Sequence, residues 1–247
     1  MLKALLLDMD ETLCDTTQAN IEAKWLMGQA VAERFSITDG EGFADAYVTG
    51  IYRDWSAAQR ARYMPIIEQQ SESAFRIQLI RDLLGERGVS QVIEQEAVAL
   101  QDKFDADRLD SFAFYPGIAE FLADARKSLT LVVITNGPVF SQVPKVEAVK
   151  LADHVDHIII GGQEPEQKPA VSIFEKALRL AGCDASEAIH VGDSLAADIA
   201  GAQNSNITSV WIQHQQPLDA ELGINPSHTV MHPREIPALI GELSGNS

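Results

Sequence analysis

Five short apolar runs are spread along the chain, and none of them alternates with polar residues. They cover residues 3–7, 129–134, 157–160, 188–191 and 207–212. A strand that is covered on both faces has this pattern, because neither face meets water. Between the last four runs, apolar residues recur at helical spacing over residues 139–151, 170–181 and 195–204. Strands and helices that alternate in this way predict an α/β fold with a doubly wound parallel sheet.

A long interval separates the first run from the second. Residues 8–128 are far more than one crossover helix needs. Apolar residues such as Phe75, Leu79 and Leu83 recur there at helical spacing, over residues 17–34, 41–55, 71–84 and 91–104. We therefore predict an all-helical domain, residues 16–115, inserted after the first strand of an α/β core, residues 1–15 and 116–247. The turn Tyr115-Pro116-Gly117 marks the return to the sheet.

The residues that follow each strand are the informative ones, because open parallel sheets bind ligands beyond the carboxyl ends of their strands. Asp8 and Asp10 directly follow the first strand. Two carboxylates beside a buried strand are unfavourable unless a cation offsets their charge. A polar turn in which Asp10 or Thr12 caps a helix is the alternative interpretation.

The second and third predicted strands also end in polar residues. Thr135 and Asn136 follow the second strand, where a hydroxyl and backbone N–H groups can hold phosphoryl oxygens or simply cap a helix. Lys168 follows the third strand. Pro169 suits the first position of the next helix and keeps Lys168 extended, so the ammonium is aimed at the strand ends. Taken alone, Lys168 also fits an ordinary surface lysine.

The fourth predicted strand ends in Gly192, which permits a close backbone approach, and Asp193. Ser194 can cap the following helix, and Asp198 lies in its first turns. Carboxylates of this kind are the ligands that Mg²⁺ takes in proteins, together with water and substrate phosphate. We call the polar residues that follow the ends of these four successive strands the polar tips. Together they predict one site for phosphate and metal at one edge of the sheet.

Charge and composition restrict the partners. The chain has 247 residues, is 46% hydrophobic and carries a formal net charge of -17. Such a surface repels nucleic acid and anionic membranes, so we expect neither as a partner. No apolar run is long enough for a membrane span, and Cys14 and Cys183 form no disulfide framework. We expect a cytoplasmic monomer or homodimer, whose pocket must reverse the negative field locally if its substrate is an anion.

The polar tips, taken in order, resemble the four motifs of the haloacid dehalogenase superfamily. The matching segments are Asp8-Met9-Asp10-Glu11-Thr12, Thr135-Asn136, Lys168-Pro169 and Gly192-Asp193-Ser194 through Asp198. The helical insertion resembles the cap domain of that superfamily. The resemblance implies a Mg²⁺-dependent phosphatase that acts on a small phosphorylated metabolite.

The resemblance also implies a role for each tip residue. Asp8 would attack phosphorus and form an aspartyl phosphate, and Asp10 would serve as general acid and then general base. Mg²⁺ would be held by the Asp8 carboxylate, the Asp10 backbone carbonyl and Asp193. Thr135 and Asn136 would hold the phosphoryl oxygens. Lys168 would neutralise the nucleophile, and Asp198 would support the metal waters or Lys168.

Residues 158–174 and 208–212 are similar to the N-acylneuraminate-9-phosphatase branch of the superfamily. The pyrimidine 5′-nucleotidase branch fits Asp10-Glu11-Thr12 as well, and a phosphomutase would keep both aspartates. A 2-haloacid dehalogenase needs neither a metal nor a second acid, and a catalytically silent binding protein would be expected to have lost a charged tip. A cluster in the insertion either faces a sugar acid or nucleotide base, or packs within the helices: Tyr52, Arg53, Trp55, Arg60, Arg62 and Tyr63.

Overall fold

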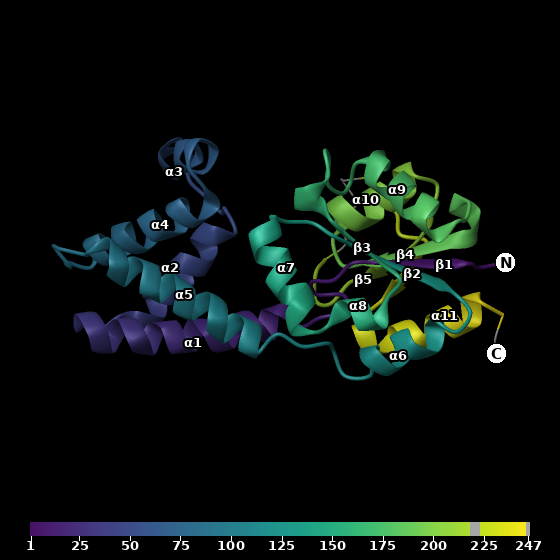
Figure 1. Ribbon diagram of the computed structural model, residues 1–247, viewed down its shortest axis with the longest axis horizontal. Coiled ribbons are helices and arrows are strands. Elements are labelled where there is room, and N and C mark those ends of the chain that lie inside the picture. Colours follow the sequence, from purple (N-terminus) through teal and green to yellow (C-terminus); the bar gives the residue numbers. More distant parts are fainter. Residues whose placement is uncertain (218–222, 246–247) are drawn as a thin grey trace. The chain divides into compact units, whose positions relative to one another are not determined.

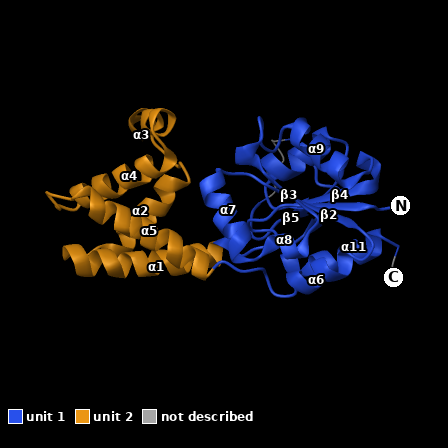
Figure 2. Cartoon of the chain, in the orientation of Figure 1, with its two compact units in different colours: residues 1–16, 112–247 blue, residues 17–111 orange. Residues whose placement is uncertain are grey.

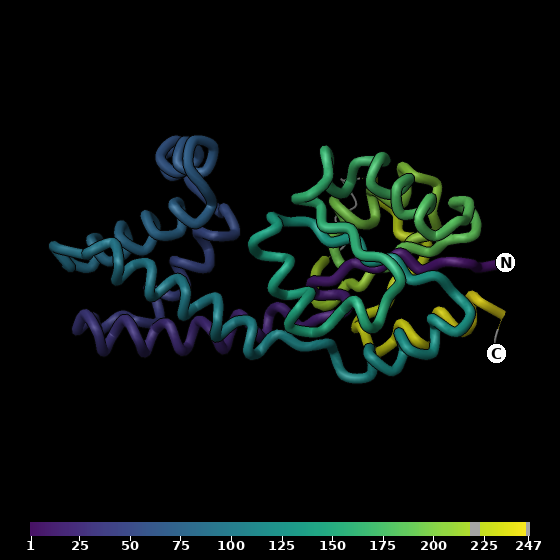
Figure 3. Tube along the Cα trace, in the orientation of Figure 1, coloured from purple at the N-terminus to yellow at the C-terminus, as the bar shows by residue number. Residues whose placement is uncertain are grey.

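The computed structural model describes residues 1–217 and 223–245. The chain divides into two compact units (Figure 2). Residues 1–16 and 112–247 form an α/β unit, and residues 17–111 form a helical unit, against the 16–115 predicted for the insertion. Figure 3 follows the chain from the first strand into the helical unit and back to the second strand. Within the described residues, no helix is both long and apolar enough to cross a membrane.

The α/β unit contains one parallel sheet of six strands in the order β3-β2-β1-β4-β5-β6. The strands are β1 (Ala4–Leu7), β2 (Thr130–Thr135), β3 (His157–Ile160), β4 (Ala188–Gly192), β5 (Thr208–Ile212) and β6 (His228–Val230). The predicted fold class is confirmed. The sequence did not predict β6, because Val230 is the only buried residue of this edge strand and no apolar run results.

The strand order reverses beside β1. The chain places β2 and β3 on one side of β1, and then β4, β5 and β6 on the other. Leu7 pairs with Val133 on β2 and with Val191 on β4, so the next residue, Asp8, emerges between the ends of two neighbouring strands. Ligands bind at such a switch point in doubly wound sheets.

Helices cover both faces of the sheet (Figure 1). On one face, Ala4 and Leu6 of β1 pack with Ile173 and Phe174 of α9 (Val171–Ala181) and with α10 (Ala200–Asn204). On the other face lie α6 (Ile118–Ala125), α8 (Leu151–His154) and α11 (Ile236–Leu243). This double covering explains why the strand residues are continuously apolar.

Three predicted helices begin or end differently in the structure. The helix predicted over 139–151 is interrupted: α7 (Val139–Ala148) ends before Lys150, whose φ of 49° cannot continue a right-handed helix, and α8 follows. The helix predicted over 195–204 starts with a π-helical turn, Leu195–Ile199, before α10. Helix α9 begins at Val171, so the prediction that Pro169 occupies its first position was wrong.

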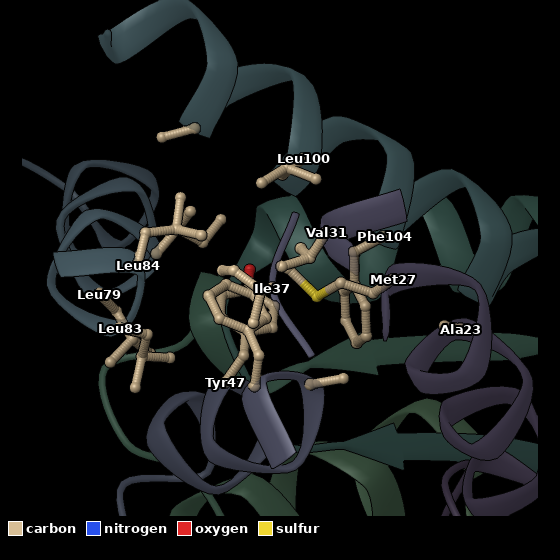
Figure 4. Packing of buried hydrophobic residues seen from close by; sticks show 14 of the residues in the cluster. Ala23, Met27, Val31, Ile37, Tyr47, Leu79, Leu83, Leu84, Leu100 and Phe104 are labelled. Atoms are coloured by element: carbon tan, nitrogen blue, oxygen red, sulfur yellow. The ribbon is translucent and has the colours of Figure 1, made fainter. Parts of the chain in front are cut away.

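The helical unit consists of α1 (Thr16–Phe35), α2 (Gly40–Ile51), α3 (Ala57–Gln69), α4 (Glu72–Glu86) and α5 (Glu94–Asp110). Helix α3 was missed by the sequence pattern because Tyr63 is its only buried residue. A capping box between Ser56 and Gln59 starts it. Figure 4 shows the core of this unit, where Met27 and Val31 of α1 gather with Tyr47 and Phe104. The rings of Tyr47 and Phe104 meet edge to face at 5.1 Å.

Candidate active site

The loop after β1 sends its two aspartates to different partners. The backbone N–H of Asp8 donates to the Val191 carbonyl at 2.9 Å, which continues the sheet by one residue. The chain then turns back, and the N–H groups of Leu13 and Cys14 both donate to the Met9 carbonyl. Asp8 contacts Lys168, whereas Asp10 contacts residues of α7.

Lys168 lies at the centre of the site and is buried. Its Nζ donates to Asp8 Oδ1 at 2.5 Å and to Asp198 Oδ1 at 2.7 Å. Burial alone would lower the pKa of Lys168, but the two carboxylates outweigh it and raise that pKa above its ordinary value. The side chain is therefore a permanent cation between two acids.

Asn136 fixes the position of Lys168 from the neighbouring strand end. Its side-chain amide donates to the Lys168 carbonyl and accepts from the Lys168 N–H, both at 2.9 Å. Each end of this amide makes one of these bonds, so the second N–H of the Asn136 amide and the hydroxyl of Thr135 remain candidates for meeting phosphoryl oxygens. Thr135 ends β2 and is 1% exposed.

Asp198 is a carboxylate with three hydrogen-bond donors. It accepts from Lys168, from Nε2 of the fully buried His190 at 2.9 Å, and from the Ser194 N–H at 3.0 Å. Burial would raise the pKa of Asp198, but Lys168 and His190 outweigh it and hold the pKa well below its usual range. Burial lowers the pKa of His190, which favours the neutral ring, and because a carboxylate only accepts, Nε2 is the nitrogen that donates to Asp198. A side chain at Gly192 would collide with Asp198, because a Cβ there would lie 2.2 Å from its Cγ.

Asp8 and Asp193 carry negative charge that their protein neighbours do not fully offset. Burial, followed by repulsion from Asp198 and Asp10, raises the pKa of Asp8 to about 7 despite the attraction of Lys168. Burial and repulsion from Asp8 and Asp198 raise the pKa of Asp193 to about 8. Oxygen atoms of Asp8, Asp193 and Asp198 all lie within 4.8 Å of one another. Three carboxylates at this spacing suit a hard divalent cation, whose charge would favour their ionised forms.

Asp10 has a different environment, made largely by α7. Its Oδ1 accepts from Lys145 Nζ and Thr16 Oγ1, both at 2.6 Å, and its Oδ2 accepts from Gln142 Nε2 at 3.0 Å. Burial would raise the pKa of Asp10, but Lys145 and the three hydrogen bonds outweigh it, so the pKa is lowered. In this conformation, Asp10 is an ionised carboxylate with both oxygens occupied.

The surrounding loops are held together by polar contacts. The Gly137 N–H donates to Gln167 Oε1 at 2.9 Å, and the Gly162 N–H donates to the Gly137 carbonyl at 3.0 Å. Trp211 of β5 donates its indole N–H to the Asp193 carbonyl at 2.8 Å. In the loop after β1, Glu11 accepts a hydrogen bond from the Tyr115 hydroxyl at 3.0 Å.

The structure brings the predicted site residues to one edge of the sheet. Asp8, Lys168 and Asp198 are directly bonded, and Asp193 joins the two aspartates in one carboxylate cluster. Asn136 is bonded to the Lys168 backbone, with Thr135 beside it at the end of β2, and Asp10 is turned towards α7. Three functional candidates were not predicted from the sequence: Gln142, Lys145 and His190.

The aromatic and arginine cluster predicted in the insertion makes contacts within the helical unit. The rings of Trp55, Tyr63 and Phe75 pack against one another with centroids 5.1 to 5.7 Å apart. Arg53 is paired with Glu72 at 2.8 Å, and Arg62 with Asp82 at 2.5 Å.

A parallel sheet with acids and a lysine at its switch point defines a hydrolase of the haloacid dehalogenase type. The chain belongs to the haloacid dehalogenase-like hydrolase family, whose profile matches residues 2–206. This confirms the resemblance found in the sequence.

Individual relatives have more specific names. The N-acylneuraminate-9-phosphatase of Rattus norvegicus is 32% identical over 137 residues, 55% of each chain, so this chain spans about half the length of that relative. A ribulose-1,5-bisphosphate 5-phosphatase of Halopiger xanaduensis is 27% identical over 250 residues, 99% of this chain and 98% of that protein. Among solved structures, a 2-haloacid dehalogenase from Pseudomonas syringae is similar, with a TM-score of 0.63 and 25% identity over 98% of this chain and 100% of that chain.

Proposed function

We propose that this protein is a Mg²⁺-dependent phosphatase that hydrolyses a small-molecule phosphate monoester through an aspartyl phosphate on Asp8. The observation that carries the proposal is that one loop holds two aspartates with different hydrogen-bond partners. Asp8 contacts the buried Lys168 beside a cluster of carboxylates, and Asp10 has its own set of donors. A nucleophile and a separate acid/base are the two groups that this chemistry requires.

In the first step, an oxygen of Asp8 attacks phosphorus and the P–O bond to the leaving group breaks. Asp10 is ionised in the free protein, so it must take up a proton when substrate binds, and it then gives that proton to the departing oxygen. Lys168 opposes the charge on the nucleophile and on the phosphoryl oxygens. The Thr135 hydroxyl and backbone N–H groups after β2 would orient those oxygens.

In the second step, the Asp10 carboxylate takes a proton from water, and that water attacks the phosphorus of the aspartyl phosphate. Inorganic phosphate leaves, and Asp8 returns as a carboxylate. Asp8 and Asp193 would hold Mg²⁺ with the Asp10 backbone carbonyl, while Asp198 keeps Lys168 in place. A bound Mg²⁺ would supply electrostatic stabilisation of the phosphoryl oxygens.

The dehalogenase alternative has a relative in its favour, since the similar Pseudomonas syringae structure is a 2-haloacid dehalogenase. In that reaction the aspartate displaces halide from carbon, and neither a metal nor a second acid is needed. Such an enzyme would have no use for Asp193 beside Asp8, or for Asp10 with its dedicated partners. The carboxylate cluster therefore favours the phosphatase.

For the substrate, the relatives suggest N-acylneuraminate 9-phosphate first, with pyrimidine nucleoside monophosphates as the alternative that the motifs also fit. Among the described residues of the α/β unit, the site residues offer groups for phosphate and metal, so we propose that the helical unit selects the rest of the molecule. The test is a screen of phosphorylated metabolites with Mg²⁺, including sugar phosphates, sugar acid phosphates and nucleoside monophosphates.

We expect phosphate release that EDTA abolishes and Mg²⁺ restores. Halide release from 2-haloacids that is insensitive to EDTA would support the dehalogenase instead. Absence of both activities over the whole screen would count against an enzyme of either kind.

A further inference from the structure

Helix α7 has an unusual distribution of side chains. Its two buried residues are the polar Gln142 and Lys145, whereas the apolar Val139 and Phe140 are 39% and 42% exposed. Burying a polar side chain is unfavourable unless it finds partners, and a buried ammonium needs an acid. Because polar residues of α7 are buried while apolar ones are exposed, we infer that the buried face of α7 serves a specific polar contact.

What it contacts is Asp10. Gln142 and Lys145 are three positions apart on a helix and so project from the same face. Lys145 Nζ lies 2.6 Å from Asp10 Oδ1, and Gln142 Nε2 lies 3.0 Å from Asp10 Oδ2, so one oxygen is held by each residue. Gln142 also donates to the Asn136 carbonyl at the end of β2. The Lys145 ammonium lies 5.5 Å from the centroid of the Phe112 ring.

Two donors on separate oxygens fix the orientation of a carboxylate as well as its location. A single partner would leave the Asp10 carboxyl group free to rotate about the bond to that partner. With Gln142 and Lys145 on one helix and Thr16 as a third donor, the plane of the carboxylate is defined. A misplacement of about 1 Å in a catalytic group can cost about 10²-fold in rate.

We propose that Gln142 and Lys145 are positioning residues for Asp10, and that Lys145 also stabilises the carboxylate that remains when Asp10 gives its proton to the leaving group. This inference rests on the proposed phosphatase function. It assigns to α7 a role in the step that protonates the leaving oxygen, separate from the Asp8–Lys168–Asp198 contacts that serve phosphorus.

The test compares esters with poor and good leaving groups. The substrates are p-nitrophenyl phosphate and the best aliphatic phosphate monoester from the metabolite screen, both with Mg²⁺. Lys145→Met should lower kcat for the aliphatic ester by about 10- to 100-fold, a part of what general acid catalysis is worth. It should change kcat for p-nitrophenyl phosphate by less than about threefold, because that leaving group hardly needs protonation. KM should stay near the wild-type value for both esters.

Three further variants complete the comparison. Lys145→Arg should restore part of the aliphatic activity, and Gln142→Met should lose less than Lys145→Met. Lys127→Met removes another lysine of the α/β unit, one paired with Asp124 at the surface, and should leave both esters unaffected. In an Asp10→Asn background, Lys145→Met should cause no further loss on the aliphatic ester, because it acts through Asp10.

Several results would overturn the inference. They are an equal loss on both esters, a full additional loss in the Asp10→Asn background, and unchanged kinetics in Lys145→Met. If Lys145→Met does not fold, Lys145→Arg and Gln142→Met decide by the same comparison of esters. A wild-type protein that hydrolyses neither ester would instead remove the proposed function, which is a different outcome from any of these.

Discussion

Charged residues are arranged differently in the helical unit and at the sheet edge of the α/β unit. In the helical unit, three exposed arginines are each paired with an acid: Arg34 with Glu96, Arg53 with Glu72 and Arg62 with Asp82. The three arginine side chains are partly exposed, so water screens each pair. The buried Arg76 and Arg108 of the same unit share one acid, Asp105. At the sheet edge, four aspartates share two buried lysines, Lys168 and Lys145.

The exposed pairs and the sheet-edge cluster therefore differ in what their charges can contribute. Exposed one-to-one pairs are nearly neutral for stability. The sheet edge has four carboxyl groups, of which Asp8 and Asp198 are buried and Asp10 and Asp193 half-buried, but only two ammonium groups. Two carboxyl groups are therefore left without a lysine of their own, and a divalent cation would offset their charge when they ionise. The raised pKa values of Asp8 and Asp193 show where that excess lies.

The largest effect should come from removing the nucleophile. Asp8→Asn should reduce phosphate release by about 10⁴-fold or more, because an amide cannot attack phosphorus. The same change removes a carboxylate from the crowded cluster, so the melting temperature of the metal-free protein should rise or stay the same. Turnover measured with p-nitrophenyl phosphate, with thermal unfolding as the control for folding, checks both expectations. Retained activity would exclude covalent catalysis by Asp8.

Removal of the acid/base should have a smaller effect that depends on the substrate. Asp10→Asn should slow hydrolysis of an aliphatic phosphate ester by about 10²- to 10⁴-fold. The loss should be much smaller for p-nitrophenyl phosphate, whose leaving group departs without a proton. Steady-state kinetics on both esters measure this. If the losses are equal, Asp10 has another role.

The stability of the metal-free protein should depend on pH. The pKa values of Asp8 and Asp193 in the folded protein, about 7 and about 8, lie above those of an unfolded chain, near 4. The folded protein therefore binds protons that the unfolded chain has lost, and its stability falls as pH rises from about 4 to 8. We expect the melting temperature in EDTA to fall by several degrees between pH 5 and pH 8.

Saturating Mg²⁺ should remove most of the dependence of the melting temperature on pH. In the absence of metal, Asp193→Asn should make that dependence weaker. Asp10 and Asp198 have lowered pKa values, so their contributions are lost only at lower pH and do not enter this window. If the melting temperature in EDTA rises with pH, or does not depend on pH, the claim that Asp8 and Asp193 carry excess negative charge is contradicted.

The smallest effect is expected in the helical unit. Arg62→Ala removes an exposed partner of Asp82 and should change the free energy of unfolding by less than about 1 kcal/mol. Hydrolysis of p-nitrophenyl phosphate should be unaffected. Denaturant unfolding of the variant and wild type measures the change. A loss of several kcal/mol would show that the helical unit also depends on specific ion pairs, and the contrast between the units would fail.

The central strands could be predicted from the sequence, because a strand that is buried on both faces has an uninterrupted apolar run. It failed at β6, an edge strand with one buried residue, and at the break between α7 and α8, where Lys150 takes a left-handed conformation without being glycine. The residues predicted for the site lie at the ends of β1, β2, β3 and β4 or in the segments that follow them, and the structure brings these segments to one edge of the sheet. Lys145, Gln142 and His190 were missed, because a single polar residue within a helix or strand has no distinctive pattern.

Their significance depends on contacts that are distant in sequence. Lys145 and Asp10 are separated by 135 positions, and only the folded sheet brings them together. A helix whose polar residues are spaced one turn apart, directly after a strand tip, is the signal that would have identified Gln142 and Lys145.

The most direct test of the site uses beryllofluoride, which mimics a phosphoryl group on an aspartate and needs no knowledge of the substrate. Thermal unfolding of the wild type should be measured with Mg²⁺, with beryllofluoride, and with both. We expect a large rise in melting temperature only with both together, and none in Asp8→Asn. Stabilisation by beryllofluoride without Mg²⁺, stabilisation that persists in Asp8→Asn, or no stabilisation at all would contradict a metal-dependent phosphoryl site at Asp8.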